Sequence, residues 1–450
     1  MVRNMTGYRT LARNHDFTAL WVGQTVSALG SAVSMFVFPL LAFAITGSTL
    51  AAAAAEALHL LGLAGALLPA GVLADRVDRL RLLRTSSAAG VLLYGSLAAA
   101  GVAGALTLPH LLVVAALTGV AAGVFMPAET SAVRAVVPTE DLPTALSQQQ
   151  ARQHVATLLG APLGGLLYAA TRWLPFAADA VSYALSFVLL GRIRADLRPP
   201  AATGPRRSAR ADIVEGLRYA WSRPFFRVLL VWSPLVNLVV NALFFVAILR
   251  LVAAGFPPVQ IGLVETAAGA AGLLGAVVAP WIIERVPTGW LTVVTTWTFA
   301  PLLVPLAQWN HPGVVAAALG LGLLLNPAGN AGIGSYRIAV TPDHLQGRLQ
   351  SSMQFVSMSA MPLSPVLAGA LLHGLGGTGA IAVLGALTAA VALIPTLSRS
   401  VRSVPRPRAW VDEPATSMAS AASAACAAEE GEATRPGAHA GVCAGARAAR

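Results

Sequence analysis

The segment GVLADRVDRLR, from Gly71 to Arg81, interrupts an apolar sequence with a cluster of charged side chains. On either side lie apolar stretches of about twenty residues, the length that a helix needs to cross roughly 30 Å of hydrocarbon. The whole chain is 56% hydrophobic and only 11% charged over 450 residues, which is too apolar for a water-soluble globule. The sequence therefore predicts an all-α integral membrane protein in which residues 71–81 connect two spans.

Apolar runs separated by polar breaks predict twelve transmembrane helices. The first six cover about 17–46, 52–74, 82–105, 109–133, 147–171 and 174–192. The last six cover about 225–249, 258–283, 288–308, 312–337, 350–373 and 379–397. We therefore expect an N-terminal six-helix bundle over 1–192 and a C-terminal six-helix bundle over 225–398.

The two remaining parts of the chain are not apolar enough to span a membrane. Residues 193–224 are rich in Arg and Pro and form a predicted cytoplasmic linker. Within it an apolar stripe predicts an amphipathic, interfacial helix; the stripe consists of Ile213, Val214, Leu217, Ala220 and Trp221. Residues 399–450 have few large apolar side chains, which predicts a disordered cytoplasmic tail.

The arginines predict the orientation, because basic residues in short loops remain on the cytoplasmic side. Nearly all lie on one face of the predicted bundle, including nine between Arg192 and Arg227, while only Arg172 and Arg250 lie on the other. The first sixteen residues are polar and do not resemble a signal peptide. We expect a multi-pass protein of the bacterial inner membrane with both termini in the cytoplasm. The net charge of +11 then reflects membrane orientation rather than binding to nucleic acid.

Several kinds of chemistry are excluded by residues that the chain lacks. It contains no lysine, so a Walker A phosphate loop and a Schiff base are absent. The only cysteines are Cys426 and Cys443, both in the predicted tail. His59 and His154 are the only histidines expected within spans, which is too few for a haem or copper site. We expect no enzyme activity, no cofactor and no metal site.

The two halves of the chain resemble each other. RAVVPTEDL, starting at Arg134, matches RIAVTPDHL, starting at Arg337, at an offset of 203 residues. AGVLADRV, starting at Ala70, matches APWIIERV, starting at Ala279, and this alignment places Glu56 over Glu265. Such a repeat predicts two pseudo-symmetric bundles with a substrate site between them.

The segment 71–81 resembles the cytoplasmic signature loop of the major facilitator superfamily. Gly71, Asp75, Arg76 and Arg79 match that motif, whereas Asp78 replaces its second glycine. The form with Asp78, together with WVGQTVSALGS from Trp21, is similar to the drug/proton antiporter branch that contains macrolide efflux pumps and the enterobactin exporter. This resemblance covers about 10–397 and implies the major facilitator fold. It also implies that the four matching residues form a gate on the inner face.

A second motif lies in the fifth predicted span. GAPLGG contributes Gly160, Pro162, Gly164 and Gly165, and it loosely resembles the proline and glycine motif of antiporters. Its spacing departs from that motif, with one residue rather than two between the proline and the paired glycines. A kinked, closely packed helix is the interpretation from residue type alone.

Four carboxyl groups lie within the predicted spans, where an ionised side chain costs several kcal/mol: Glu56, Glu129, Asp179 and Glu265. We expect no arginine deep enough to pair with them. Removal from water favours the protonated form of a carboxyl group, as a proton carrier requires. Glu129, Glu56 and Glu265 are the proton-coupling candidates. Asp179 lies nearer the outer boundary, where a merely solvated carboxylate is the simpler interpretation.

Uncharged polar side chains within the spans are candidates for a substrate cavity: Gln24, Asn237, Asn241, Asn326, Asn330 and Gln354. The asparagines form two pairs with a spacing of four, which puts each pair on one helix face. Structural hydrogen bonds between helices are the alternative role for these amides.

The residues and the resemblance together predict a monomeric, proton-coupled secondary transporter that exports apolar small molecules by alternating access. Neutral or cationic compounds fit a cavity lined by carboxyl groups. A siderophore exporter remains an alternative because Arg134 and Arg337 lie at the inner helix ends. The sequence is also compatible with a metabolite importer or uniporter of the same fold, and with a membrane scaffold or sensor.

Overall fold

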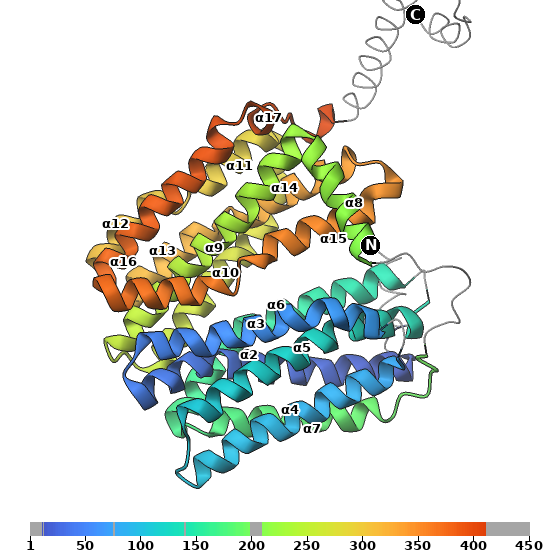
Figure 1. The fold of residues 1–450 in the computed structure, drawn as a ribbon, viewed down its shortest axis with the longest axis vertical. Coiled ribbons are helices and arrows are strands. Elements are labelled where there is room, and N and C mark those ends of the chain that lie inside the picture. The colour runs from blue at the N-terminus through green and yellow to red at the C-terminus, as the bar shows by residue number, and fades with distance from the viewer. Residues whose placement is uncertain (1–10, 12, 75–76, 139–140, 199–208, 411–450) are drawn as a thin grey trace, which may run out of the picture.

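The computed structural model describes residues 11, 13–74, 77–138, 141–198 and 209–410, and these residues form helices and connecting loops without any strand. The first six helices form one bundle, drawn in blue to green in the lower part of Figure 1. They are α2 (His15–Thr46), α3 (Thr49–Ala74), α4 (Arg79–Val102), α5 (Leu108–Val136), α6 (Leu142–Ala170) and α7 (Leu174–Leu190).

The second bundle follows a short linker helix, α8 (Ala209–Ser222), and is drawn in green to red in Figure 1. It contains α9 (Pro224–Ala253), α10 (Pro258–Arg285), α11 (Thr288–Trp297), η1 (Ala300–Leu302), α12 (Leu303–Gln308), α13 (Pro312–Leu324), α14 (Asn326–Ala339), α15 (Asp343–Ser359) and α16 (Leu363–Leu397). The short elements α17 (Arg399–Arg402) and η2 (Pro407–Ala409) come last.

These helices fit twelve crossings of a membrane. Nine stretches of the described chain are long and apolar enough to cross by length and hydropathy. One of them, Leu345–Leu397, has 53 residues and reverses direction at Gly376, whose φ of 67° is a conformation that glycine adopts without steric cost. The more polar α6 and the shorter α7 would supply the remaining two crossings. The prediction of an all-α membrane fold is confirmed, and the helices are consistent with twelve spans.

The two bundles contact each other mainly through α6 with α10 and α3 with α16. We call outer the end of the molecule that holds the turns 47–48, 171–173 and 254–257, and inner the opposite end. These names follow the arginine pattern. Each bundle also has its own aromatic packing; in the first, Phe38 lies 5.7 Å from Phe176 and 6.2 Å from Tyr94 between ring centroids.

The linker helix α8 packs on the second bundle. Its Leu217 and Ala220 join a buried cluster with Leu349 and Met353 of α15. The hydroxyl of Ser352 donates to the carbonyl of Ile213 at 3.0 Å. Two residues of the predicted stripe, Val214 and Trp221, are exposed. Its central residues Leu217 and Ala220 pack against the second bundle and not against lipid. Sequence periodicity located the apolar face of α8 but did not identify what that face contacts.

The segment just after the last span is ordered, although we expected a disordered tail from residue 399. The amide of Gly289 in α11 donates to the carbonyl of Val404 at 3.1 Å. The ring of Trp410 packs against Tyr336 with centroids 5.5 Å apart. Residues 399–410 thus cross the inner ends of α11 and α14, and the rest of the predicted tail lies outside the described residues.

Candidate functional site

A cavity of about 1050 Å³ lies between the two bundles. The first bundle contributes most of its wall, from α2, α3, α5 and α6, and the second contributes side chains of α9, α10 and the start of α16. Apolar side chains dominate the wall, with three glutamates among them: Glu56, Glu129 and Glu265. All three predicted proton-coupling residues therefore line one cavity.

The outer side of the cavity is closed by close backbone packing between the halves. A Cβ atom on Gly165 of α6 would lie 2.6 Å from the carbonyl oxygen of Pro258 at the start of α10. A side chain on Gly262 would overlap the carbonyl of Ala161, and one on Gly369 would overlap Ala53. Glycine at these positions lets helices of opposite bundles touch near their outer ends.

The GAPLGG motif contributes directly to this packing. Gly160 and Gly164 face α2, against Ala32 and Val33, while Gly165 faces α10. Pro162 lies within α6 opposite Gly262. The motif thus brings α6 against a neighbour in its own bundle and against the other bundle.

Glu56 and Glu265 occupy corresponding places in the two halves. Each is seven residues beyond the first residue of its helix, α3 or α10. Both are partly buried in the cavity wall and interact electrostatically with each other. No ion pair joins either carboxyl group to a basic side chain within the described residues. The offset between the sequence halves thus places two equivalent carboxyl groups in the wall of one cavity.

The expectation that no arginine reaches the intramembrane carboxyl groups is wrong. Arg152 of α6 donates from Nη2 to Glu129 Oε1 at 2.6 Å. Both side chains are almost completely buried, and both line the cavity. Arg152 Nε has no hydrogen-bond partner. Glu129 is therefore paired with a basic side chain, whereas Glu56 and Glu265 form no ion pair with any described basic side chain.

The predicted cavity amides separate into two groups. Gln24 and Asn241 line the cavity; Gln24 donates to Ser186 Oγ at 3.3 Å and Asn241 to the carbonyl of Asn237 at 2.7 Å. The other amides do not line it. Asn237 donates to Ser357 Oγ at 2.8 Å, Asn330 donates to Asn326 Oδ1 at 2.7 Å, and Gln354 contacts the sulfur of Met358. The predicted alternative, a structural hydrogen bond between helices, describes Asn237, which joins α9 to α15. The contacts of Asn330 and Gln354 lie within α14 and α15 and fit neither predicted role.

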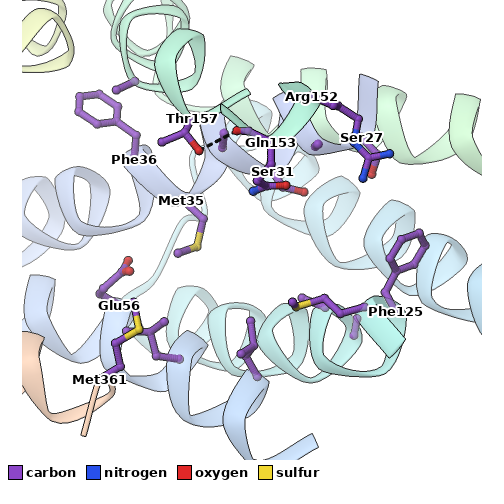
Figure 2. A pocket seen from close by; sticks show the side chains of 18 of the residues that line it. Ser27, Ser31, Met35, Phe36, Glu56, Phe125, Arg152, Gln153, Thr157 and Met361 are labelled. Carbon is purple, nitrogen blue, oxygen red and sulfur yellow. Dashed lines mark hydrogen bonds between the residues drawn. The ribbon is translucent and has the colours of Figure 1, made fainter. Parts of the chain in front are cut away.

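Several lining residues were not predicted. Figure 2 shows Met35, Met361 and Glu56 together at one end of the cavity, with Arg152 and Ser27 at the other. Methionine and phenylalanine are ordinary in an apolar span, so composition gives no signal for them. Arg152 had a signal: it follows three consecutive glutamines, Gln148 to Gln150, in a helix that is otherwise apolar toward its end.

The predicted gate is described only in part, because Asp75 and Arg76 lie outside the described residues. Gly71 is in the last turn of α3, and Arg79 is the first residue of α4. The amide of Arg79 donates to the carbonyl of Leu197 at 3.4 Å. Asp78, the residue that departs from the family motif, caps α4 by accepting from the amide of Leu80 at 2.9 Å.

Comparison with known proteins places these features in a family. The sequence profile of the Major Facilitator Superfamily matches residues 20–328. The multidrug efflux pump Tap of Mycolicibacterium fortuitum is 28% identical over 391 residues, which cover 80% of this chain and 88% of that protein. Its counterpart in Mycobacterium tuberculosis is 27% identical over 376 residues, which cover 78% of this chain and 85% of that protein.

Solved structures share the fold at lower sequence identity. A bacterial homologue of the iron transporter ferroportin in an inward-facing state superposes with a TM-score of 0.68 at 18% identity, covering 87% of this chain and 99% of that chain. A bacterial homologue of the human lysosomal transporter Spinster, inward-facing and unoccupied, gives a TM-score of 0.65 at 13% identity, covering 86% and 96% respectively.

Proposed function

The chain belongs to the major facilitator superfamily, and from this premise we propose that it is a proton-driven exporter of apolar small molecules. It is a multi-pass membrane transporter, and the proposal adds the direction, the driving ion and the substrate class. The main support for this proposal is one cavity between the two bundles, in which carboxyl groups from both bundles lie among apolar side chains.

The way in which the halves meet supports alternating access. The glycine contacts around Gly165 and Gly262 keep the outer ends together, whereas the cavity wall extends inward to Leu146 and Thr130. Rocking the bundles about the cavity would separate the outer contacts and expose the same wall to the outside. The matching loops at the inner ends, with Gly71, Asp75, Arg76 and Arg79 as the gate, would then hold the inner side closed.

The outward direction is supported by the relatives whose names describe drug efflux, at 27% to 28% identity. The substrate class is supported by the wall itself. Glu56 and Glu265 face the cavity near Met35 and Met361, so a positively charged or neutral apolar molecule would be favoured there. A carboxylate pair without a basic partner repels anions.

Proton coupling would use the same carboxyl groups. A substrate cation and a proton cannot both neutralise one carboxylate, so binding of one would release the other. A membrane potential of 100 mV moves one charge for about 2.3 kcal/mol, and a tenfold gradient costs about 1.4 kcal/mol. For a neutral substrate, one proton per cycle could therefore sustain a gradient of roughly fifty-fold. Exchange of one proton for one monovalent cation moves no net charge, so the pH gradient alone would drive it.

A siderophore exporter remains a second candidate because of Arg152. This buried guanidinium lines the cavity and has an Nε donor without a partner, as a site for an anionic group requires. Its pairing with Glu129 neutralises it in the present arrangement, which is why the cationic or neutral class is the first choice.

The experiment begins with a susceptibility panel of neutral, cationic and anionic apolar compounds, in cells that express the protein or carry an empty vector. A compound to which the protein confers resistance is then radiolabelled and offered to everted vesicles that maintain an acidic interior. Accumulation that collapses when a protonophore is added supports proton-driven export. Accumulation that is unaffected by the protonophore, or a lack of resistance to every compound, would contradict the proposal.

The bacterial inner membrane, cytoplasmic termini and a monomeric state are parts of the same proposal. A reporter that is active only in the cytoplasm, fused within residues 193–224, should be active. A periplasmic reporter fused at the same place should be silent. The opposite pattern would overturn the assignment of inner and outer ends.

A further inference from the structure

A polar seam runs between α2 and α7 inside the first bundle. On α2 it is formed by Gln24, Ser27, Ser31 and Ser34, whose spacing of three and four residues places them on one helix face. On α7 it is formed by Asp179, Ser182, Tyr183 and Ser186. Most of these side chains are buried, in a bundle whose other internal contacts are mainly apolar.

Asp179 lies at the centre of this seam. Its side chain is 0% exposed, and Oδ1 accepts from Ser182 Oγ at 3.0 Å. The second carboxyl oxygen, Oδ2, is buried and has no hydrogen-bond partner. On the α2 side the carboxyl group lies against Gly30, where any added side chain would overlap it. Because Gly30 has no side chain, there is room for the carboxyl group of Asp179 at this position.

No basic side chain pairs with Asp179 among the residues that the structure describes. The titratable groups that interact with it are the phenols of Tyr94 on α4 and Tyr183 on α7, while α2 presents serines and a glycine. An ionised carboxylate in this position would be a buried, unpaired charge, which costs several kcal/mol. A protonated carboxyl group at this place carries no such cost.

The seam reaches the cavity one helical turn from Asp179, although no hydrogen bond joins Asp179 to Tyr183 or Ser31 in this arrangement. Tyr183, one helical turn after Asp179, shares a hydrogen bond of 2.9 Å between its hydroxyl and Ser31 Oγ. Tyr183 and Ser31 both line the cavity, whereas Asp179 does not. Hydroxyl groups donate and accept at once, so a pair of them can relay a proton between cavity water and a buried acid.

We propose that Asp179 is a proton-binding site separate from the substrate cavity, and that it exchanges its proton with cavity water through the hydroxyls of Ser31 and Tyr183. A substrate in the cavity cannot displace this proton by direct contact. The site differs in this respect from Glu56 and Glu265, at which proton and substrate would compete under the proposed function. Its existence depends on neither the direction of transport nor the identity of the substrate.

The test uses the purified full-length protein in liposomes and infrared difference spectroscopy, which detects the carbonyl stretch of a protonated carboxyl group. The wild type should show such a band, and labelling aspartate with carbon-13 should shift it. Asp179→Asn should abolish the shifted band. The matched control is Asp196→Asn, because Asp196 is an exposed aspartate at the inner end and its replacement should leave the band unchanged.

A second variant tests the connection. Tyr183→Phe removes one hydroxyl and should keep the band, but it should slow the exchange of the carboxyl proton for deuterium at least tenfold. Exchange at the wild-type rate would overturn the relay. The absence of an aspartate-dependent band in the wild type would overturn the site even if Asp179→Asn fails to fold. Neither result depends on transport, so both are distinguishable from failure of the proposed export function.

Discussion

Nη2 of Arg152 and Oε1 of Glu129 are 2.6 Å apart, and the two side chains are only 6% and 8% exposed. The pair links α5 to α6 in the part of the cavity nearer the inner end. Two charges that are removed from water together stabilise each other only while both are present. The consequence of replacing one partner therefore differs from that of replacing both.

Glu129→Gln should lower the free energy of unfolding by about 3–5 kcal/mol, because it leaves a buried guanidinium without a counter-ion. The double variant with Arg152→Gln should recover much of that loss. Unfolding of the purified variants, monitored by tryptophan fluorescence, measures the free energy of unfolding of the single and the double variant. Glu215→Gln is the matched control, since Glu215 pairs with Arg348 at 2.8 Å near the surface and its loss should cost less than about 1 kcal/mol. A double variant less stable than either single one would show that the pair is not the source of the effect.

Glu56→Gln and Glu265→Gln should each leave the protein folded but reduce proton-driven efflux at least tenfold, because glutamine cannot release a proton. Efflux driven only by the substrate's own gradient should persist. The measurement compares the two kinds of efflux from vesicles loaded with a compound identified by susceptibility testing. Glu215→Gln provides the control, because Glu215 lies on α8 and does not line the cavity. Full proton-driven efflux in both variants would show that neither residue couples proton entry to efflux and that another carboxyl group does.

Gly262→Val should prevent closure of the outer side, because a side chain at this position overlaps the carbonyl of Ala161 in the other bundle. A cysteine in place of Met35, which lines the cavity, should then react faster with a membrane-impermeant maleimide added from outside. The background is a variant in which Cys426 and Cys443, the only native cysteines, are replaced by alanine.

The control for this experiment is Gly272→Val on the same helix, where a Cβ atom meets nothing within 4 Å. Labelling should remain at the level of the parent protein in that variant. Equal labelling in the two valine variants would mean that the contact at Gly262 does not close the outer side.

Trp410→Ala should destabilise the second bundle by about 3 kcal/mol, since it removes a large buried side chain that packs on Tyr336. It also removes the hydrogen bond from the indole to the carbonyl of Pro405 at 2.9 Å. Thermal unfolding of the purified protein measures the loss. Trp309→Ala, at an exposed position in an outer loop, should change stability little. Similar shifts in the two variants would argue against a structural role for residues 399–410.

Much of the fold follows from local sequence, as α3 and α10 illustrate. Their length and hydropathy predict two spans, and the repeat predicts that Glu56 and Glu265 occupy equivalent places. Both predictions depend on residues close together in the chain or on one constant offset. The close approach of the GAPLGG helix likewise follows from residue type, because glycine is the only residue without a Cβ atom.

The partners of polar side chains could not be predicted in the same way. Asn326 and Asn330 share a helix face as their spacing requires, yet they bond each other and do not line the cavity. Arg152 belongs to the polar start of a span, but it reaches Glu129 on another helix. Helical periodicity gives the direction of a side chain around its own axis, and it gives no information about which helix lies opposite.

The sequence by itself determined the class of protein and the equivalent positions of Glu56 and Glu265 in their helices, because these depend on hydrocarbon thickness, helix rise and internal repetition. The tertiary structure alone decided that Glu129 is paired, that Glu56 and Glu265 line one cavity, and that α8 packs on α15. It also decided that Asp179 is buried in a seam where no described basic side chain pairs with it. The reason is that ion pairing and burial depend on distances between helices, which the sequence of one helix does not encode.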